Sequence, residues 1–229
     1  MNFITSLKSL TKFEKCLWIV SVLTVAGTFF LFKSTDYLTL TASLIGVSAL
    51  IFLAKGHAIG QILIIIFSVF YGIISFKFRY YGEMITYLGM TAPMAVVALV
   101  SWLRHPYKNS SEVEISRLTK KKIAVMIFFT LITTAAFYFI LKKLGNASLF
   151  VSTVSVTTSF LAAYLTALRS PYYALGYAAN DLVLIVLWII AAKEDISSLS
   201  MAVCFATFFV NDMYGFFNWR KMEKRQKCE

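Results

Sequence analysis

The chain has 229 residues, of which 59% are hydrophobic and 14% are charged, and its formal net charge at neutral pH is +11. Soluble domains carry about 25% charged residues. This composition, with a mean hydropathy of +0.75, therefore excludes a soluble globular protein and predicts an all-α membrane protein. The positive charge does not indicate a nucleic-acid partner, because basic residues beside anionic membrane lipids explain it.

The sequence divides into eight apolar segments at its charged residues, glycines and prolines. A membrane-spanning helix needs about 20 mostly apolar residues. We predict spans at 16–32, 38–54, 60–78, 84–103, 123–141, 149–168, 172–192 and 199–219. The chain is then a single membrane domain with an extra N-terminal helix (1–35), a three-helix unit (36–105), a cytoplasmic loop with a linker helix (106–146), a second three-helix unit (147–221) and a cytoplasmic tail (222–229).

The distribution of basic residues predicts the orientation. With eight spans, both termini lie on one side of the membrane. That side carries most of the 22 Lys and Arg residues, from Lys8 to Lys227, whereas Lys33 and Lys77 belong to the few on the other side. The positive-inside rule therefore predicts cytoplasmic termini.

The two three-helix units resemble each other in sequence. When the second unit is aligned on the first, Gly60 matches Gly176, and Trp102 matches Trp219 one residue out of register. A single linker helix between the units makes both enter the membrane from the same side. We therefore predict parallel repeats, with a site near the membrane midplane between them.

Polar residues of the first unit follow helical stripes. Gln61, Ser68 and Ser75 are seven residues apart in span 60–78, and Tyr71 lies beside them. In the next span Pro93 lacks an N–H group and is expected to kink the helix. Glu83 starts that span close to Arg79, and we expect the two side chains to form an interfacial ion pair.

The second unit contains acids inside apolar segments. Tyr177, Asp181 and Trp188 share a stripe of span 172–192, and Asn180 lies next to Asp181. A charge at this depth costs about 2.5–3.5 kcal/mol, so a functional role is favoured over a neutral, hydrogen-bonded carboxyl group. The serines of span 149–168 are expected to serve helix packing instead.

The last span ends with the most polar stretch of the chain. Asn211, Tyr214 and Asn218 share one helix face, and Asp212 lies beside them. Acids and amides at membrane depth usually face a bundle interior or a cavity. We therefore expect the substrate site here.

These side chains suit a small, flat, polar and cationic metabolite, such as a nucleoside-like vitamin. Aromatic rings stack on a flat ring or a cation, acids favour positive charge, and amides bind hydroxyl groups. Trp188 and Tyr214 are expected to stack, Asp181 or Asp212 to hold the charge, and the amides to bind polar groups. The predicted substrate-binding residues are Gln61, Tyr71, Tyr177, Asn180, Asp181, Trp188, Asn211, Asp212, Tyr214 and Asn218.

Other functional classes have little support in the sequence. The three cysteines and two histidines show no metal-binding spacing, and His57 and His105 fall in predicted loops. The chain contains no nucleophile elbow and no glycine-rich phosphate loop. We therefore predict no catalytic residue, no metal, no cofactor and no enzymatic activity.

The last span resembles the PnuC-type nicotinamide riboside transporter family. The resemblance rests on Asn211-Asp212-Met213-Tyr214-Gly215-Phe216-Phe217-Asn218-Trp219, which is similar to that family's Asn-x-Tyr-Gly-x-x-x-Trp segment with one extra residue. It implies a SWEET-like fold, a bacterial cytoplasmic membrane location and often a homotrimer. It also implies facilitated diffusion, with the substrate trapped by cytosolic phosphorylation for NAD biosynthesis. The first unit departs from the motif, since residues 94–102 keep only Trp102.

Three alternatives stay open at this stage. The substrate could be thiamine or riboflavin, which relatives in the same family are believed to carry. Asp181 or Asp212 could cycle protonation in a proton-coupled carrier. The chain could also be a membrane enzyme or a sensor subunit, which the lack of a soluble catalytic or signalling domain disfavours.

Overall fold

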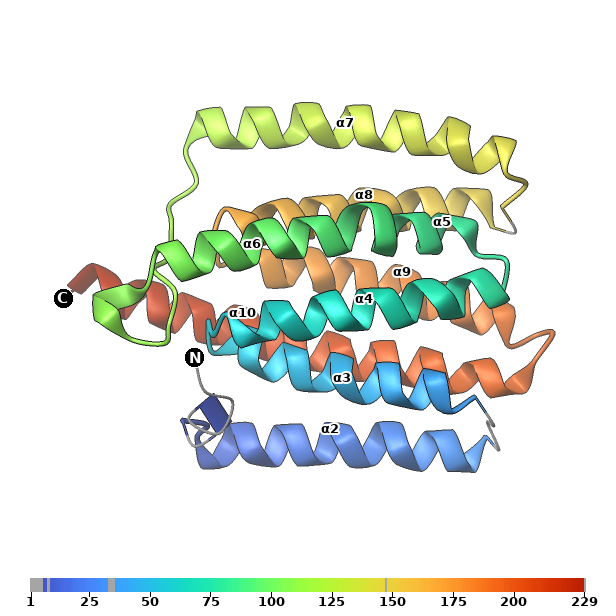
Figure 1. Ribbon diagram of the computed structural model, residues 1–229, viewed down its shortest axis with the longest axis horizontal. Helices are drawn as coiled ribbons and strands as arrows, with labels where there is room; N and C mark the ends of the chain where they lie inside the picture. Colours follow the sequence, from blue (N-terminus) through green and yellow to red (C-terminus); the bar gives the residue numbers. More distant parts are fainter. Residues whose placement is uncertain (1–5, 8, 33–35, 147, 229) are drawn as a thin grey trace.

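The computed structural model describes residues 6–7, 9–32, 36–146 and 148–228 (Figure 1). Within them, 8 helices are long and apolar enough to cross a membrane, so the prediction of eight spans is confirmed. Lys8 and Lys33 lie outside the described residues. The spans are α2 (Lys12–Leu31), α3 (Tyr37–Ala54), α4 (Ile59–Lys77), a composite span (Tyr81–Arg104), α7 (Lys120–Lys143), α8 (Leu149–Ala167), α9 (Tyr173–Ala191) and α10 (Leu199–Cys228).

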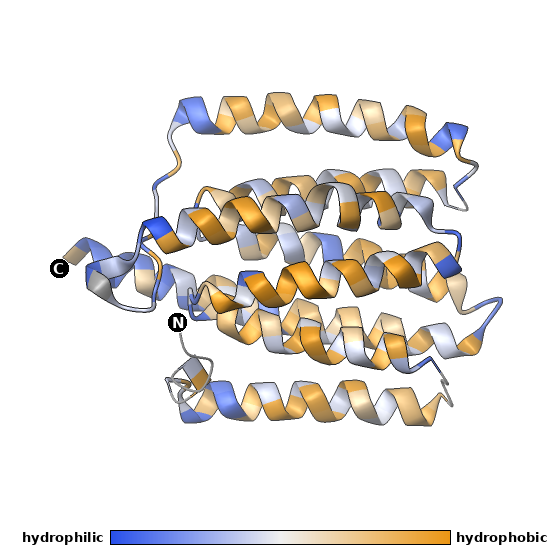
Figure 2. Ribbon diagram, in the orientation of Figure 1, coloured by the Kyte–Doolittle hydropathy of each residue, from blue (hydrophilic) through white to orange (hydrophobic). Residues whose placement is uncertain are grey.

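The helices lie side by side, with α2 along one flank and α7 along the other (Figure 1). Hydrophobic residues make up most of each helix, and hydrophilic residues gather near the helix ends (Figure 2). On α7, for example, Phe128, Leu131 and Phe139 are exposed. Such outward apolar surface is expected of helices that contact lipid tails.

The composite span changes its helical geometry in the middle. It consists of α5 (Tyr81–Ile85), a π-helical segment η1 (Thr86–Thr91) and α6 (Ala92–Arg104). Pro93 lies at the start of α6 and has no N–H group to donate to the preceding turn. The disruption thus falls in the turn before Pro93, where the N–H of Ala92 donates to the carbonyl of Tyr87. π-Helical turns occur frequently at functional sites.

The last helix continues well beyond residue 219, its predicted end. Glu223 pairs with Arg220 and Lys227 on the same helix face, which extends the helical geometry. The side chain of Gln226 also bonds the backbone of the loop before α7, accepting from the N–H of Ile115 at 2.9 Å. These contacts explain why the polar end of the chain stays helical to Cys228.

Two tryptophans meet at the end of the bundle where α2 begins and α10 ends, which we call the terminal end. The Nε1 of Trp219 on α10 donates to the carbonyl of Leu53 in the last turn of α3, at 2.8 Å. The Nε1 of Trp102 on α6 donates to the carbonyl of Thr166 in the last turn of α8, at 3.0 Å. The two indole rings are 5.3 Å apart and both are buried. They therefore close the bundle at this end.

The residues before the tryptophans make a second matching pair of contacts. The Nδ2 of Asn218 donates to the carbonyl of Ala54 at 2.8 Å, and the Oγ of Ser101 donates to that of Ala167 at 3.1 Å. In each three-helix unit, the third helix is thus bonded to the first helix of the other unit. We call these four bonds the crossed contacts.

Candidate functional site

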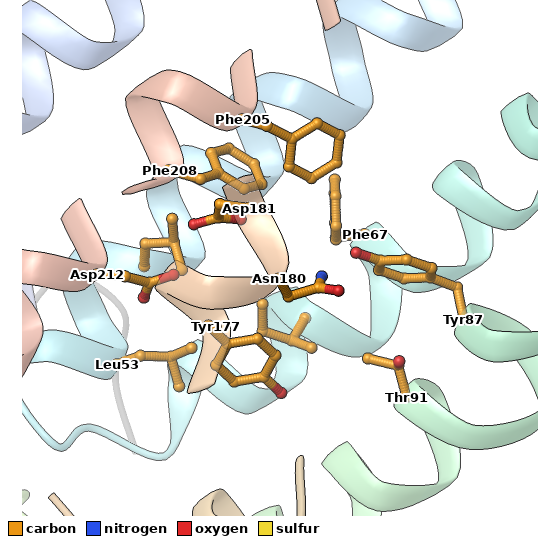
Figure 3. A pocket seen from close by; sticks show the side chains of 12 residues that line it. Leu53, Phe67, Tyr87, Thr91, Tyr177, Asn180, Asp181, Phe205, Phe208 and Asp212 are labelled. Carbon is orange, nitrogen blue, oxygen red and sulfur yellow. The ribbon is translucent and has the colours of Figure 1, made fainter. Parts of the chain in front are cut away.

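A cavity lies inside the bundle between α3, α4, η1, α9 and α10 (Figure 3). Its volume of about 30 Å³ is room for one or two water molecules. The residues that line it are Leu50, Leu53, Ile64, Phe67, Tyr87, Thr91, Tyr177, Asn180, Asp181, Phe205, Phe208 and Asp212. Four of these were predicted from the sequence: Tyr177, Asn180, Asp181 and Asp212.

The two acids of the cavity come from adjacent helices. Asp181 on α9 and Asp212 on α10 are 4% and 3% exposed, and both line the same cavity. The Oδ2 of Asp181 has no hydrogen-bond partner in the described part of the chain. None of the described lining residues is basic. The described lining therefore offers two acidic side chains and no basic one, a combination that suits a positively charged ligand better than a negatively charged one.

Asn180 is held in one orientation by hydroxyl groups of α8. Its Oδ1 accepts hydrogen bonds from Ser155 at 3.2 Å, Thr158 at 2.9 Å and Ser159 at 3.0 Å. The opposite atom, Nδ2, is directed towards the hydroxyl group of Tyr87 (Figure 3). The serines expected to serve helix packing thus fix a hydrogen-bond donor at the cavity.

Aromatic rings form another part of the cavity wall, beside Leu50, Leu53, Ile64 and Thr91. Phe67 lies 5.9 Å from Tyr87 and 5.6 Å from Phe208, and Phe205 lies 5.3 Å from Phe208, all between ring centroids. Tyr177 stands on the opposite side of Asn180 (Figure 3). Sequence reasoning assigned no site role to Phe67, Tyr87, Phe205 or Phe208, because a phenylalanine or tyrosine within an apolar helix gives no periodic signal of its own.

Three predicted residues on α10 lie away from the cavity. The Nδ2 of Asn211 donates to the Oγ of Ser21 on α2 at 2.9 Å, and the hydroxyl group of Tyr214 donates to Glu14 on α2 at 2.8 Å. Asn218 takes part in the crossed contacts. Their shared helix face is polar because it packs against α2 and α3.

The other three predicted residues also lie outside the lining. We call the end of the bundle opposite the terminal end the distal end. Trp188 is fully buried towards the distal end, and its Nε1 donates to the hydroxyl group of Tyr71 at 2.8 Å. Tyr71 in turn packs 4.3 Å from Tyr87. Gln61 is buried near the terminal end, and its Nε2 has no partner among the described residues. These side chains surround the site without lining it.

The expected ion pair of Glu83 is wrong. Glu83 is 0% exposed, whereas Arg79 is exposed, and no ion pair joins them in the described chain. The Oε2 of Glu83 instead accepts a hydrogen bond from Ser155 at 3.1 Å. Sequence proximity to an arginine at a span end did not reveal that the helix turns this carboxyl group inwards.

The described residues contain no group of three His, Cys, Asp or Glu side chains that could hold a metal ion. His57 is buried in the loop between α3 and α4, where burial and then the nearby Lys55 lower its pKa to about 4. This imidazole is therefore neutral at physiological pH.

Gly46 on α3 supports the cavity wall. A Cβ atom at this position would lie 2.3 Å from the Cζ of Phe208, so the Gly46→Ala variant must displace that ring. We expect a loss of about 1–3 kcal/mol in the free energy of unfolding, together with weaker ligand binding, because Phe208 lines the cavity. Thermal unfolding and calorimetry on the purified protein measure both effects.

Gly215 on α10 provides the matched control for Gly46. A Cβ atom there would have its nearest neighbour at 3.5 Å, an ordinary contact. The Gly215→Ala variant should therefore bind ligand normally and unfold at an equal or higher temperature, since alanine is a better helix former. Equal effects of the two substitutions would contradict the assignment of Gly46.

Comparisons with known proteins place the chain in a family. A family model described as nicotinamide mononucleotide transporter matches residues 36–221. A protein of Neisseria mucosa, named nicotinamide riboside transporter PnuC, is 28% identical over 221 residues, which cover 94% of this chain and 83% of that protein. A protein of the same name from Haemophilus influenzae is 21% identical over 192 residues, covering 83% of this chain and 82% of its own length.

A solved structure supports the same assignment. The chain resembles the crystal structure of the vitamin B3 transporter PnuC with a TM-score of 0.83 and 25% sequence identity, covering 95% of this chain and 94% of the other. These relatives are named as transporters, a class without enzymatic activity, in agreement with the sequence analysis. The chain therefore belongs to the PnuC family of membrane transporters, which the matching family model describes as nicotinamide mononucleotide transporters.

Proposed function

We propose that this protein carries nicotinamide riboside across the bacterial cytoplasmic membrane. The observation that carries the proposal is the pair of acids, Asp181 and Asp212, in a cavity walled by aromatic rings. The pyridinium ring of nicotinamide riboside is flat and positively charged. Carboxylates attract such a ring, and aromatic faces add about 0.5–2 kcal/mol of cation–π attraction.

The charge of the cavity favours the riboside over the mononucleotide. The two compounds differ by a phosphate group, which carries a charge of about −1.5 to −2 at neutral pH. Phosphate needs basic side chains or helix N-termini as partners. The described lining residues include two acids and no base, so a phosphate here would be repelled.

The roles of the lining residues follow from their chemistry. Asp181 and Asp212 balance the charge of the ring, and the rings of Phe67, Tyr87, Phe205 and Phe208 contact its faces. The Nδ2 of Asn180 is the donor for an acceptor oxygen of the carboxamide or the ribose. Among the predicted residues outside the lining, Trp188 and Tyr71 act by supporting Tyr87 in this conformation.

Binding requires the bundle to open. Drug-sized ligands occupy pockets of about 300 Å³ or more, whereas this cavity measures about 30 Å³. The aromatic side chains must therefore move apart to admit the riboside. We propose alternating access, in which the crossed contacts close one face while the distal end opens to the other.

From the family resemblance we also propose facilitated diffusion, trapping of the substrate by cytosolic phosphorylation, and assembly as a homotrimer within the lipid bilayer. From the distribution of basic residues we propose that both termini are cytoplasmic. A proton-coupled carrier is the alternative, which the two buried acids in one cavity favour. Loss of uptake by vesicles when a protonophore is added, in the absence of any kinase, would support that alternative.

Calorimetry on the purified protein tests the substrate. Nicotinamide riboside is expected to bind, and nicotinamide mononucleotide to bind at least about tenfold more weakly, because its phosphate meets the acids. Thiamine and riboflavin are the comparison ligands. Preferential binding of the mononucleotide would refute the charge argument, and preferential binding of thiamine or riboflavin would change the substrate while leaving the site in place.

A further inference from the structure

Glu83 is a buried acid without a basic partner. It lies in the short helix α5 near the distal end and is 0% exposed. Its Oε1 has no hydrogen-bond partner among the described residues. The Oγ1 of Thr86, one helical turn later, also lacks one. Buried polar atoms are normally paired, and an unpaired acid at membrane depth indicates a functional site.

Aromatic side chains lie near this acid in the fold. Tyr80 directly precedes α5, Tyr87 follows Glu83 by one helical turn, and the Tyr87 ring packs 4.3 Å from that of Tyr71. Trp188 packs 5.8 Å from Tyr80 and 6.2 Å from Tyr71, and it donates its N–H to the Tyr71 hydroxyl group. An acid among aromatic rings is the same combination that the cavity offers to a flat cation.

Two contacts connect Glu83 to the cavity. The Oγ of Ser155 lies 3.1 Å from Glu83 and 3.2 Å from the Oδ1 of Asn180. Tyr87, which lines the cavity together with Asp181, lies one helical turn after Glu83 on the same span. Glu83 therefore lies beyond the aromatic wall of the cavity, towards the distal end, and shares Tyr87 with it.

We propose that Glu83, Tyr71, Tyr80, Tyr87 and Trp188 form a distal subsite, which receives the positively charged ring of the substrate on its way between the distal face and the cavity. The inference rests on the proposed function, because it takes the substrate to be an organic cation. When the aromatic wall parts, Tyr87 separates from its neighbours and the ring passes between two acidic sites. Glu83 lowers the electrostatic barrier of that step.

Uptake by proteoliposomes carrying the full chain tests the subsite. Glu83→Gln keeps the shape and the hydrogen bond to Ser155 but removes the charge, whereas Glu83→Asp keeps the charge. We expect initial uptake of nicotinamide riboside at subsaturating concentration to fall about tenfold in Glu83→Gln and less than about threefold in Glu83→Asp. Equilibrium binding to the purified Glu83→Gln variant should stay within about twofold of wild type.

Several outcomes would overturn the subsite. Unchanged uptake by the Glu83→Gln variant would show that transport does not depend on the charge of Glu83. Equal losses of uptake in both variants would show that Glu83 has a structural role through Ser155. A binding loss as large as the uptake loss makes Glu83 part of the main site. If neither variant folds, the Tyr80→Leu variant tests the subsite instead. It removes an aromatic wall of the subsite at a position away from Ser155. The proposal then requires this variant to slow uptake about threefold.

The reduced form of nicotinamide riboside provides a second readout. Its ring is uncharged, so Glu83→Gln should leave its uptake within about twofold of wild type. A loss equal to that of the charged form would contradict a charge effect. Uptake by the wild-type protein separates the two proposals. If the wild type transports no nicotinamide riboside, the proposed function fails. If the wild type and the Glu83→Gln variant transport it equally well, only the subsite is refuted.

Discussion

Replacing both Asp181 and Asp212 by asparagine is expected to abolish measurable binding of nicotinamide riboside, and each single replacement to weaken it about 30-fold. Asparagine keeps the size of aspartate and one acceptor oxygen but carries no charge, so the change tests mainly the charge. A charge pair near 4 Å contributes about 4 kcal/mol at an effective dielectric constant of 20, and desolvation of the ligand offsets part of it. About 2 kcal/mol for each acid corresponds to that 30-fold loss.

Calorimetric titration of the two single variants and the double variant measures this effect. Asp195→Asn, an exposed position in the loop before α10, is the control and should bind as wild type does. Binding within threefold of wild type in the double variant would refute the role of the acids.

Removing the indole of Trp219 is expected to give the largest loss of stability. The side chain is fully buried, lies 4.8 Å from the Tyr173 ring and 5.3 Å from that of Trp102, and bonds the carbonyl of Leu53. Trp219→Ala leaves a large cavity and should lower the free energy of unfolding by about 3–5 kcal/mol. Thermal unfolding in detergent measures the shift in the unfolding midpoint.

Trp219→Phe separates the hydrogen bond from the packing. It keeps an aromatic ring but cannot donate to Leu53, so it should cost only about 0.5–1.5 kcal/mol. The terminal end should then open more readily, and the rate of uptake should change more than ligand affinity does. Trp18→Phe on α2 removes a comparable bond, to the Oγ of Ser48 at 3.1 Å, and should leave uptake unchanged. Equal effects of the two variants on uptake would contradict a gating role for Trp219.

The sequence revealed the fold through composition and hydropathy, which report directly on contact with lipid. It also identified Asp181 and Asp212, because an acid in an apolar span is costly enough to require a reason. Their neighbours Phe67, Phe205 and Phe208 could not be recognised, since a phenylalanine facing a cavity looks the same in sequence as one facing lipid.

The face shared by Asn211, Tyr214 and Asn218 illustrates a second limit. Helical spacing showed that these polar residues avoid lipid, but it could not show which neighbour they contact. In the folded chain they bond Ser21, Glu14 and Ala54, on α2 and α3. Their partners are far away in sequence, and only the packing of α10 between those helices brings them together.

The crossed contacts change which parts of the protein can act as rigid bodies. Because α10 is bonded to the end of α3 and α6 to the end of α8, neither three-helix unit can swing away at the terminal end as a whole without breaking all four bonds. A motion that keeps them must divide each unit internally, so that α3 travels with α10 and α6 with α8. The mechanical halves of this transporter are then assembled from helices of both predicted three-helix units.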